Sequence, residues 1–139
     1  MELLVDRAGP ITKLTFNRPD IRNALTKEMK EQLSSCLHQI ALDDEVKVVV
    51  LAGEGQHFMA GGDLNTMRET IKLSEPEIKN YFLRRIHDLN PIITCLQQMA
   101  KPVIASVSGA AAGAGVSMAL ACDLIIAQRS SYFTLGYCK

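Results

Sequence analysis

The sequence predicts an α/β fold, and three observations support this prediction. Short runs rich in β-branched residues, such as Val46–Ala52 and Val103–Val107, alternate with longer segments of helical periodicity. Val46–Ala52 is almost entirely apolar, which is typical of a parallel strand covered on both faces. The chain has no linker, low-complexity tract or strong internal repeat. We therefore expect one domain over residues 1–139.

The N-terminal elements are predicted to be a hairpin followed by a helix. Leu3–Val5 and Ile11–Phe16 are strand-like, and Ala8-Gly9-Pro10 between them is typical of a turn. Thr26 is a favourable N-cap for a helix near Lys27–Leu42. This helix would place its apolar side chains on one face, namely Met29, Leu33, Cys36, Leu37 and Ile40.

The rest of the chain continues the alternation. Ser74, followed by acidic residues and Pro76, predicts the start of a second long helix. We expect this helix to end near Leu89, because Asn90-Pro91 interrupts the pattern, and a further helical segment to span Ile92–Met99. The remaining predicted elements are a strand at Val103–Val107, a small-residue helix, and strands at Asp123–Ala127 and Tyr132–Leu135.

Composition fits a globular protein and excludes several classes of function. Apolar residues make up 47% and charged residues 22% of the chain, which is ordinary for globular domains. Fifteen basic residues balance fifteen acidic ones without clustering, which argues against nucleic-acid binding. No apolar run is long enough for a membrane span, and the N-terminus lacks the features of a signal peptide. We expect a cytoplasmic protein without nucleic-acid or membrane partners.

The cysteines do not indicate a metal site. Cys36, Cys95, Cys122 and Cys138 form no Cys-x-x-Cys pair, and only three histidines accompany them. This spacing also argues against a secreted disulfide framework. We therefore expect reduced, buried thiols and no bound metal.

Two glycine-rich loops follow strand-like segments and indicate the chemistry of the site. His57–Leu64 follows Val46–Ala52, and Gly109–Gly115 follows Val103–Val107. A helix start built from glycine and alanine leaves its first N–H groups open to an anionic oxygen. Two such turns can supply two backbone donors to one oxygen, which is the arrangement of an oxyanion hole. The sequence therefore predicts an enzyme that activates a carbonyl group.

Five segments occur in a characteristic order: Asn17–Leu25, Phe58–Leu64, Lys101-Pro102, Gly109–Gly115 and Ala121–Ala127. In this order they resemble the enoyl-CoA hydratase/isomerase (crotonase) family over essentially the whole chain. The resemblance implies a spiral of strand-strand-helix turns. In the family, a C-terminal helical part then covers the acyl-CoA site and mediates trimerisation. Because Lys139 closely follows a strand-like segment, we expect this chain to be the N-terminal part of the family core.

The resemblance also implies a substrate and its contacts. The substrate would be an acyl-CoA thioester, with coenzyme A as part of the substrate and no other cofactor. The complete chain would form a homotrimer or a dimer of trimers. The backbone N–H groups of Ala60 and Ala114 would be the oxyanion donors, and Ala114 replaces the usual glycine, which is tolerable if its φ stays negative. Substrate contacts are implied for Arg22, Ala24, Gly61, Gly62, Asp63, Leu64 and Gly113, and Asp63 is also a predicted helix cap.

The acid/base positions depart from the family pattern. Hydratases of the family use two glutamates, and the corresponding positions here are Ser117 and Tyr137. A serine hydroxyl and an unperturbed tyrosine are poor bases near neutral pH. Other members place an aspartate just downstream, which would lie beyond Lys139. We therefore expect an isomerase, a hydratase or a hydrolase-like relative that stabilises a thioester enolate without two-glutamate hydration.

Two alternative functions remain open at this stage. One is a catalytically silent subunit that binds CoA esters or assists assembly. The other is a serine hydrolase that uses Ser106, Ser108 or Ser117, although no Gly-x-Ser-x-Gly elbow is present. A dinucleotide-binding fold is disfavoured, because the residues after Gly115 break the required glycine spacing and no acid ends the next strand.

Overall fold

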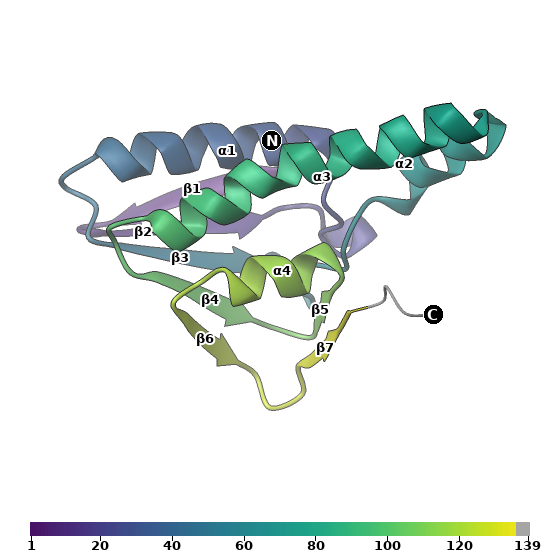
Figure 1. Cartoon of the computed structure of the whole chain (residues 1–139). Coiled ribbons are helices and arrows are strands. Elements are labelled where there is room, and N and C mark those ends of the chain that lie inside the picture. The colour runs from purple at the N-terminus through teal and green to yellow at the C-terminus, as the bar shows by residue number, and fades with distance from the viewer. Residues whose placement is uncertain (136–139) are drawn as a thin grey trace.

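The computed structural model describes residues 1–135, and within them all side chains except those of Asn65 and Glu69. Figure 1 shows a main sheet with two long helices along one side of it. The strands are β1 (Leu3–Ala8), β2 (Ile11–Phe16), β3 (Val48–Gly53), β4 (Val103–Val107), β5 (Ala110–Ala112), β6 (Leu124–Ala127) and β7 (Tyr132–Thr134). The helices are α1 (Lys27–Leu42), α2 (Leu64–Glu69), α3 (Glu75–Gln98) and α4 (Ala114–Leu120), with short 3-10 turns η1 (Pro19–Ile21) and η2 (Thr70–Lys72).

The main sheet has the strand order β1-β2-β3-β4-β6. β1 and β2 form the predicted antiparallel hairpin, and each later neighbouring pair is parallel. Parallel pairing requires crossovers, and helices supply them. The predicted alternation of strands and helices is therefore confirmed.

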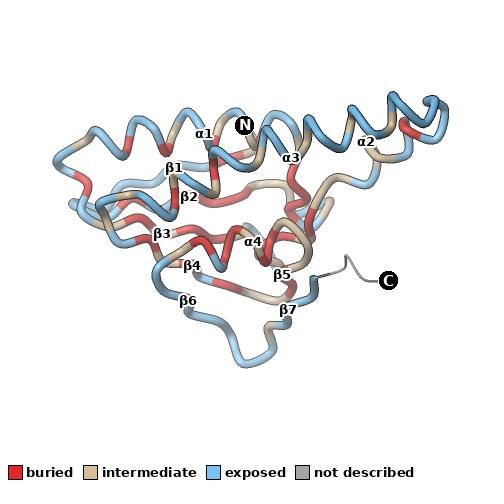
Figure 2. Tube along the Cα trace, viewed as in Figure 1, coloured by how far each residue is buried: buried red, intermediate tan, exposed pale blue. Residues whose placement is uncertain are grey.

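Helix α1 begins and ends where the sequence predicts. The Thr26 hydroxyl accepts a hydrogen bond from the Met29 N–H at 3.0 Å, which satisfies one of the open donors at the helix start. At the other end, the Lys101 ammonium donates to the carbonyls of Ile40 and Asp43. Lysine near a helix C-terminus is stabilising, and here it also ties α1 to the start of β4. Figure 2 shows the buried face of α1 toward the sheet.

Helix α3 corrects the prediction of an interruption at Asn90-Pro91. The helix runs continuously from Glu75 to Gln98 with Pro91 inside it. Proline removes one backbone hydrogen bond, but Ile92 and Leu96 beyond it are both 1% exposed and join the same core as α1. Their packing holds the last turns in line with the first. None of the helices that the structure describes, α3 included, is long and apolar enough to cross a membrane.

The prediction of a strand turning directly into a helix was incomplete, because β5 lies between β4 and α4. β5 pairs in parallel with β7 and forms a bridge to Met59. Three alanines have little intrinsic strand preference, so pairing with partners distant in sequence decides their conformation. The order β4-β5-α4-β6-β7 is a strand-strand-helix turn followed by two further strands. The predicted α/β spiral is therefore confirmed.

The last two strands expose apolar side chains. All residues of β6 and β7 are exposed (Figure 2), and Ile126 and Tyr132 are 64% and 52% exposed. An exposed edge strand and adjoining apolar residues are features that promote association.

We therefore expect the 139-residue chain, expressed alone, to self-associate or exchange elements between copies. Sedimentation velocity on the isolated chain measures this directly. A single sharp monomer that unfolds cooperatively and binds no apolar dye would contradict the expectation.

Candidate active site

The two glycine-rich loops lie side by side and are joined by backbone hydrogen bonds. The Phe58 N–H donates to the Ser108 carbonyl at 2.7 Å, and the Met59 N–H donates to the Ala110 carbonyl at 3.1 Å. The Ala112 N–H returns a bond to the Met59 carbonyl at 2.9 Å. These bonds extend from the ends of β3 and β4, so the sheet itself brings the two predicted loops together.

On its other side, the first loop is joined to the segment after η1. The Ala60 N–H donates to the Arg22 carbonyl at 2.9 Å, and the Leu25 N–H donates to the Gly61 carbonyl at 2.7 Å. The Ala60 N–H is therefore already engaged within the protein. The structure does not support Ala60 as an open oxyanion donor, because its amide has a good acceptor already.

Three glycines allow this close approach of backbones. Gly61 and Gly113 have φ values of 102° and 49°, which other residues rarely adopt. Gly115 lies against the first loop, and a Cβ there would come within 2.4 Å of the Met59 carbonyl oxygen. Part of the glycine content therefore serves packing between α4 and the Phe58–Gly62 segment.

Asn23 fixes the segment that contacts the first loop. It is fully buried and has a left-handed φ of 55°. Its side-chain oxygen accepts from the Arg18 N–H at 2.8 Å. Its amide nitrogen donates to the carbonyls of Glu54 and His57 at 2.9 and 2.7 Å. One side chain thus connects the turn at η1 with the approach to the glycine loop.

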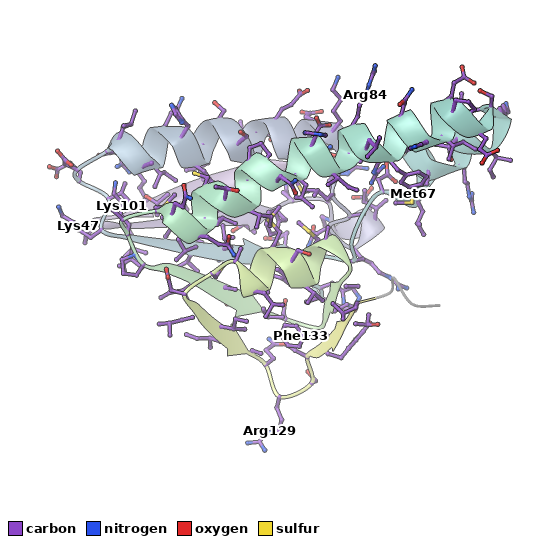
Figure 3. All side chains as sticks on the ribbon, viewed as in Figure 1. Lys47, Met67, Arg84, Lys101, Arg129 and Phe133 are labelled. Atoms are coloured by element: carbon purple, nitrogen blue, oxygen red, sulfur yellow. The ribbon has the colours of Figure 1, made fainter. Side chains whose placement is uncertain are left out.

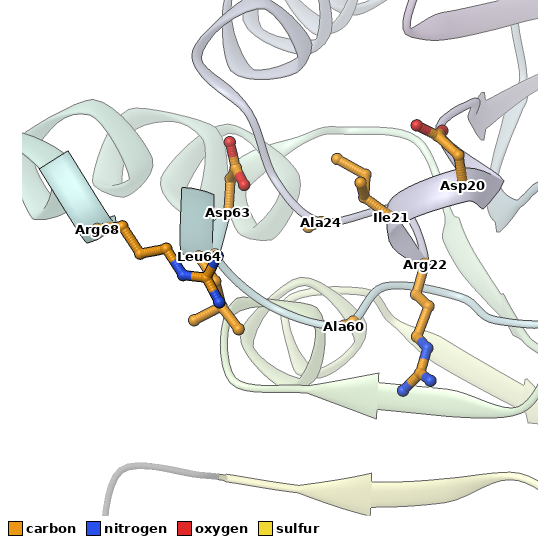
Figure 4. A pocket seen from close by; sticks show the side chains of 9 residues that line it. Asp20, Ile21, Arg22, Ala24, Ala60, Asp63, Leu64 and Arg68 are labelled. Carbon is orange, nitrogen blue, oxygen red and sulfur yellow. The ribbon is translucent and has the colours of Figure 1, made fainter. Parts of the chain in front are cut away.

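A cavity of about 430 Å³ opens between these segments (Figure 4). Arg22 and Arg68 both line this cavity and lie on opposite sides of Ala60 in this view. Asp20 also lines the cavity, but Arg18 donates to it at 3.1 Å and lowers the pKa of its carboxyl. Six predicted site residues line this cavity, namely Arg22, Ala24, Ala60, Gly62, Asp63 and Leu64.

A second cavity of about 380 Å³ lies between the glycine loops and α3. Gly62, Gly113 and Ala114 line it from the loops. Side chains that the sequence analysis did not assign to a site line it from elsewhere, namely Leu25, Lys30, Met67, Phe82, Arg85, Ile86 and Leu89. Gly62 lines both cavities and so marks the place where they meet.

Gly62 and Ala114 each offer a backbone donor beside this second cavity. Within residues 1–135, neither of their N–H groups donates a hydrogen bond to another described residue. Positive φ among the described non-glycine residues is confined to Arg22 and Asn23, so Ala114 keeps a negative φ. The alanine that replaces the family's glycine is therefore accommodated without backbone strain.

The predicted acid positions do not form a base in the described part of the chain. Ser117 is half-buried on α4 and lines neither of these two cavities. Tyr137 lies outside the described residues. Asp63 directly precedes α2, and its carboxylate accepts a hydrogen bond from the Thr66 hydroxyl at 2.6 Å.

No serine–histidine pair is present among the described side chains. The His57 Nδ1 atom instead accepts from the Ala110 N–H at 3.2 Å. No group of three or more metal-binding side chains occurs within the described residues. The predicted thiols Cys36, Cys95 and Cys122 are half-buried rather than buried, and Cys138 lies outside the described residues. Partial burial, with Asp123 nearby, raises the pKa of the Cys122 thiol to about 12, and partial burial also raises the pKa of Cys36 and Cys95. These thiols are therefore protonated near neutral pH.

Two similar proteins are named as a CoA isomerase and a CoA hydratase. The chain is 38% identical over 129 residues to the 1,2-epoxyphenylacetyl-CoA isomerase of Escherichia coli K12, covering 93% of this chain and 48% of the relative. It is 37% identical over 135 residues to the 2,3-dehydroadipyl-CoA hydratase of the same organism, covering 96% and 49%. The chain thus spans about half the length of these relatives.

Solved structures that are 30% or more identical in sequence to this chain share its fold. An enoyl-CoA hydratase from Polaromonas sp. JS666 superposes with a TM-score of 0.88 at 36% identity, covering 97% of this chain and 51% of that one. An enoyl-CoA hydratase from Bacillus anthracis superposes with a TM-score of 0.84 at 30% identity, covering 96% and 50%. The sequence matches the enoyl-CoA hydratase/isomerase family over residues 6–139. Together with the two joined glycine loops, this match shows that the chain belongs to the enoyl-CoA hydratase/isomerase family.

Proposed function

We propose that this chain forms the thioester-binding part of an enzyme that stabilises the enolate of an acyl-CoA. One observation carries the proposal: Gly62 lines both cavities, one of which is also lined by two arginines, while the other has mainly apolar walls. The CoA moiety would occupy the first cavity and the acyl group the second. The thioester would then lie at their junction, beside the N–H groups of Gly62 and Ala114.

Each part of the arrangement suits this chemistry. Arg22 and Arg68 provide positive charge for phosphate groups. Removing a proton beside a thioester, or adding a nucleophile to its conjugated double bond, places negative charge on the carbonyl oxygen. Two fixed backbone donors stabilise that charge, and each contributes about 3–4 kcal/mol. The proposal thus replaces Ala60 with Gly62 as the partner of Ala114, and it requires no cofactor beyond the substrate's own CoA.

A binding experiment on the protein at its natural full length tests this proposal. Calorimetry would compare an acyl-CoA thioester with the matching alkyl-CoA thioether, which lacks the carbonyl oxygen. We expect the thioester to bind more tightly, because only its oxygen can accept from Gly62 and Ala114. Equal affinities for the two compounds would show that Gly62 and Ala114 do not hold the thioester oxygen, whichever reaction the enzyme catalyses.

The whole protein is expected to hydrate crotonyl-CoA weakly. Ser117 supplies no carboxylate, and it lies in neither of the two cavities described above. Steady-state hydration assays beside an ordinary hydratase measure this. Efficient hydration would show that other groups position and activate the water.

The position of Ser117 also favours a second candidate, a catalytically silent subunit that binds CoA esters. Thioester binding without turnover on any enoyl-CoA would identify it. We propose that either form assembles as a homotrimer or dimer of trimers, as the family resemblance implies. The exposed apolar side chains of β6 and β7 support this proposal, because assembly would offer a way to bury them.

A further inference from the structure

An arginine side chain reaches the place where the two cavities meet. Arg85 lines the second cavity from α3 and is half-buried. Its neighbours in the α3 wall are apolar, namely Phe82, Ile86 and Leu89. A Cβ built on Gly62 would be 2.5 Å from Nη2 of Arg85 and 3.6 Å from its Cζ. The Nη2 end of the guanidinium is therefore the part directed at Gly62.

Tyr81, one turn earlier on α3, holds the other end of the guanidinium. Nη1 of Arg85 donates to the Tyr81 hydroxyl at 2.8 Å, and Cζ lies 5.5 Å from the centre of the tyrosine ring. A cation this close to an aromatic ring is attracted to it. Arginine carries five N–H groups, more than one phenol oxygen can accept. The placement of Nη2 beside Gly62 follows from these distances, whichever acceptors meet the remaining N–H groups.

This placement brings a third donor to the site of the two open backbone N–H groups. Standard geometry puts the Cβ position about 2.5 Å from the backbone nitrogen of the same residue. Nη2 of Arg85 therefore lies no more than about 5 Å from the Gly62 nitrogen. Two donors that bind one oxygen, each at about 2.9 Å, are themselves about 4 to 5 Å apart. The separation of Nη2 and the Gly62 nitrogen is thus compatible with a shared oxygen.

We propose that Arg85 is a third, charged donor to the thioester oxygen, beside the N–H groups of Gly62 and Ala114. This role rests on the proposed function, because that function places the thioester at the junction of the two cavities. All three residues line the second cavity, so their donors border the same space. When a proton is removed beside the thioester, or a nucleophile adds to its conjugated double bond, an electron pair moves onto the oxygen. A cation beside the oxygen stabilises that charge by hydrogen bonding, and no proton is transferred to or from Arg85.

A charged donor in this position acts mainly on the chemical step. The oxygen carries a partial charge in the bound substrate and nearly a full charge in the enolate, so the contact with Arg85 strengthens during the reaction. Only interactions that strengthen in this way accelerate the reaction itself. Loss of Arg85 should therefore lower kcat more than it raises KM.

The test combines infrared spectroscopy with calorimetry on the natural full-length protein. Hexanoyl-CoA with an isotopic label at the thioester carbonyl reports how strongly its oxygen is polarised, because hydrogen bonds to this oxygen lower the C=O stretching frequency. R85M removes the charge and every donor but keeps an unbranched side chain that suits the apolar wall. We expect the frequency in R85M to be higher than in the unmodified protein. The preference for hexanoyl-CoA over its thioether analogue, S-hexyl-CoA, should fall about 10- to 100-fold, as expected for one charged hydrogen bond.

Arg84 provides a matched control. It is exposed and lines neither of the two cavities. In the view of Figure 3 it lies on the opposite side of α3 from Met67, a residue of the cavity wall. R84M removes the same formal charge as R85M, so it corrects for long-range attraction of the CoA phosphates. We expect R84M to leave the carbonyl frequency and the preference for the thioester unchanged.

Two further variants separate the contributions of charge and position. R85K keeps the charge but has a shorter reach and no planar donor edge, so it should retain only part of the frequency shift. Y81F keeps the ring and removes only the phenol oxygen that holds Nη1. It should change the frequency in the same direction as R85M but by less, and it should add nothing in the double variant with R85M, because Tyr81 acts through Arg85.

Two results would overturn the inference. One is a carbonyl frequency in R85M, or in R85K if R85M does not fold, equal to that in the unmodified protein. The other is an equal loss of affinity for hexanoyl-CoA and S-hexyl-CoA in R85M, which would give Arg85 a role in packing the cavity wall. Failure of the proposed function looks different, because the unmodified protein would then bind the two compounds equally.

Discussion

Replacing Ala114 with proline is expected to lower the turnover of the complete enzyme about 100- to 1000-fold, because one oxyanion donor is lost. The structure favours a folded variant. Ala114 is the first residue of α4, where proline is well tolerated. Gly113 has φ 49° and ψ −114°, the mirror image of the extended conformation favoured before proline, and glycine adopts both forms freely. Turnover on the best acyl-CoA substrate measures the effect.

The control for this variant is Ala114→Gly, which keeps the N–H and restores the glycine usual in the family. It should retain turnover close to that of the unmodified enzyme. The ratio of thioester to thioether affinity gives a second readout, and it should fall toward one in Ala114→Pro alone. Unchanged turnover and an unchanged ratio in a folded Ala114→Pro variant would show that this N–H does not contact the substrate.

Replacing Asn23 with alanine is expected to lower the free energy of unfolding by about 3–5 kcal/mol. The change leaves one N–H and two carbonyls without their partner at a fully buried position, and each such group costs about 1–3 kcal/mol. Alanine also tolerates the φ of 55° less well than asparagine does. Urea unfolding of the natural full-length protein measures the loss.

Two further substitutions separate the causes. Asn23→Gly removes the same hydrogen bonds but adopts the left-handed backbone freely, so it should be less destabilising than Asn23→Ala. Asn23→Asp keeps the acceptor for the Arg18 N–H and loses both donated bonds. If Asn23→Ala unfolds at the same urea concentration as the unmodified protein, the three hydrogen bonds do not stabilise the fold as we infer.

Local signals in the sequence were sufficient for most of the fold. The extent of α1 followed from Thr26 and one apolar face, because capping and periodicity act within a few residues. The two errors arose where distant contacts override local preference. β5 exists because β7 and Met59 pair with it, and α3 continues past Pro91 because Ile92 and Leu96 are buried. The residues next to β5 and Pro91 in the sequence do not indicate these distant contacts.

The site was predicted less completely than the fold. The two glycine loops carry a strong sequence signal, and the structure joins them as expected. The pattern did not show which N–H groups stay open, since that depends on Arg22 accepting a bond from Ala60. The α3 wall of the second cavity also has a signal in the sequence. Phe82, Arg85, Ile86 and Leu89 follow helical spacing, which places a cation within an apolar stripe.

The uneven anchoring of α3 has a consequence for how the second cavity opens. The only buried side chains of this helix are Ile92 and Leu96, both beyond Pro91. Residues 75–90 are therefore attached by half-buried and exposed contacts, and Pro91 removes one of the hydrogen bonds that link the two parts. In amide hydrogen exchange, segments with few buried contacts open at a fraction of the global free energy. The wall that contains Arg85 can thus move on its own, so ligand entry need not disturb the sheet that holds the backbone donors.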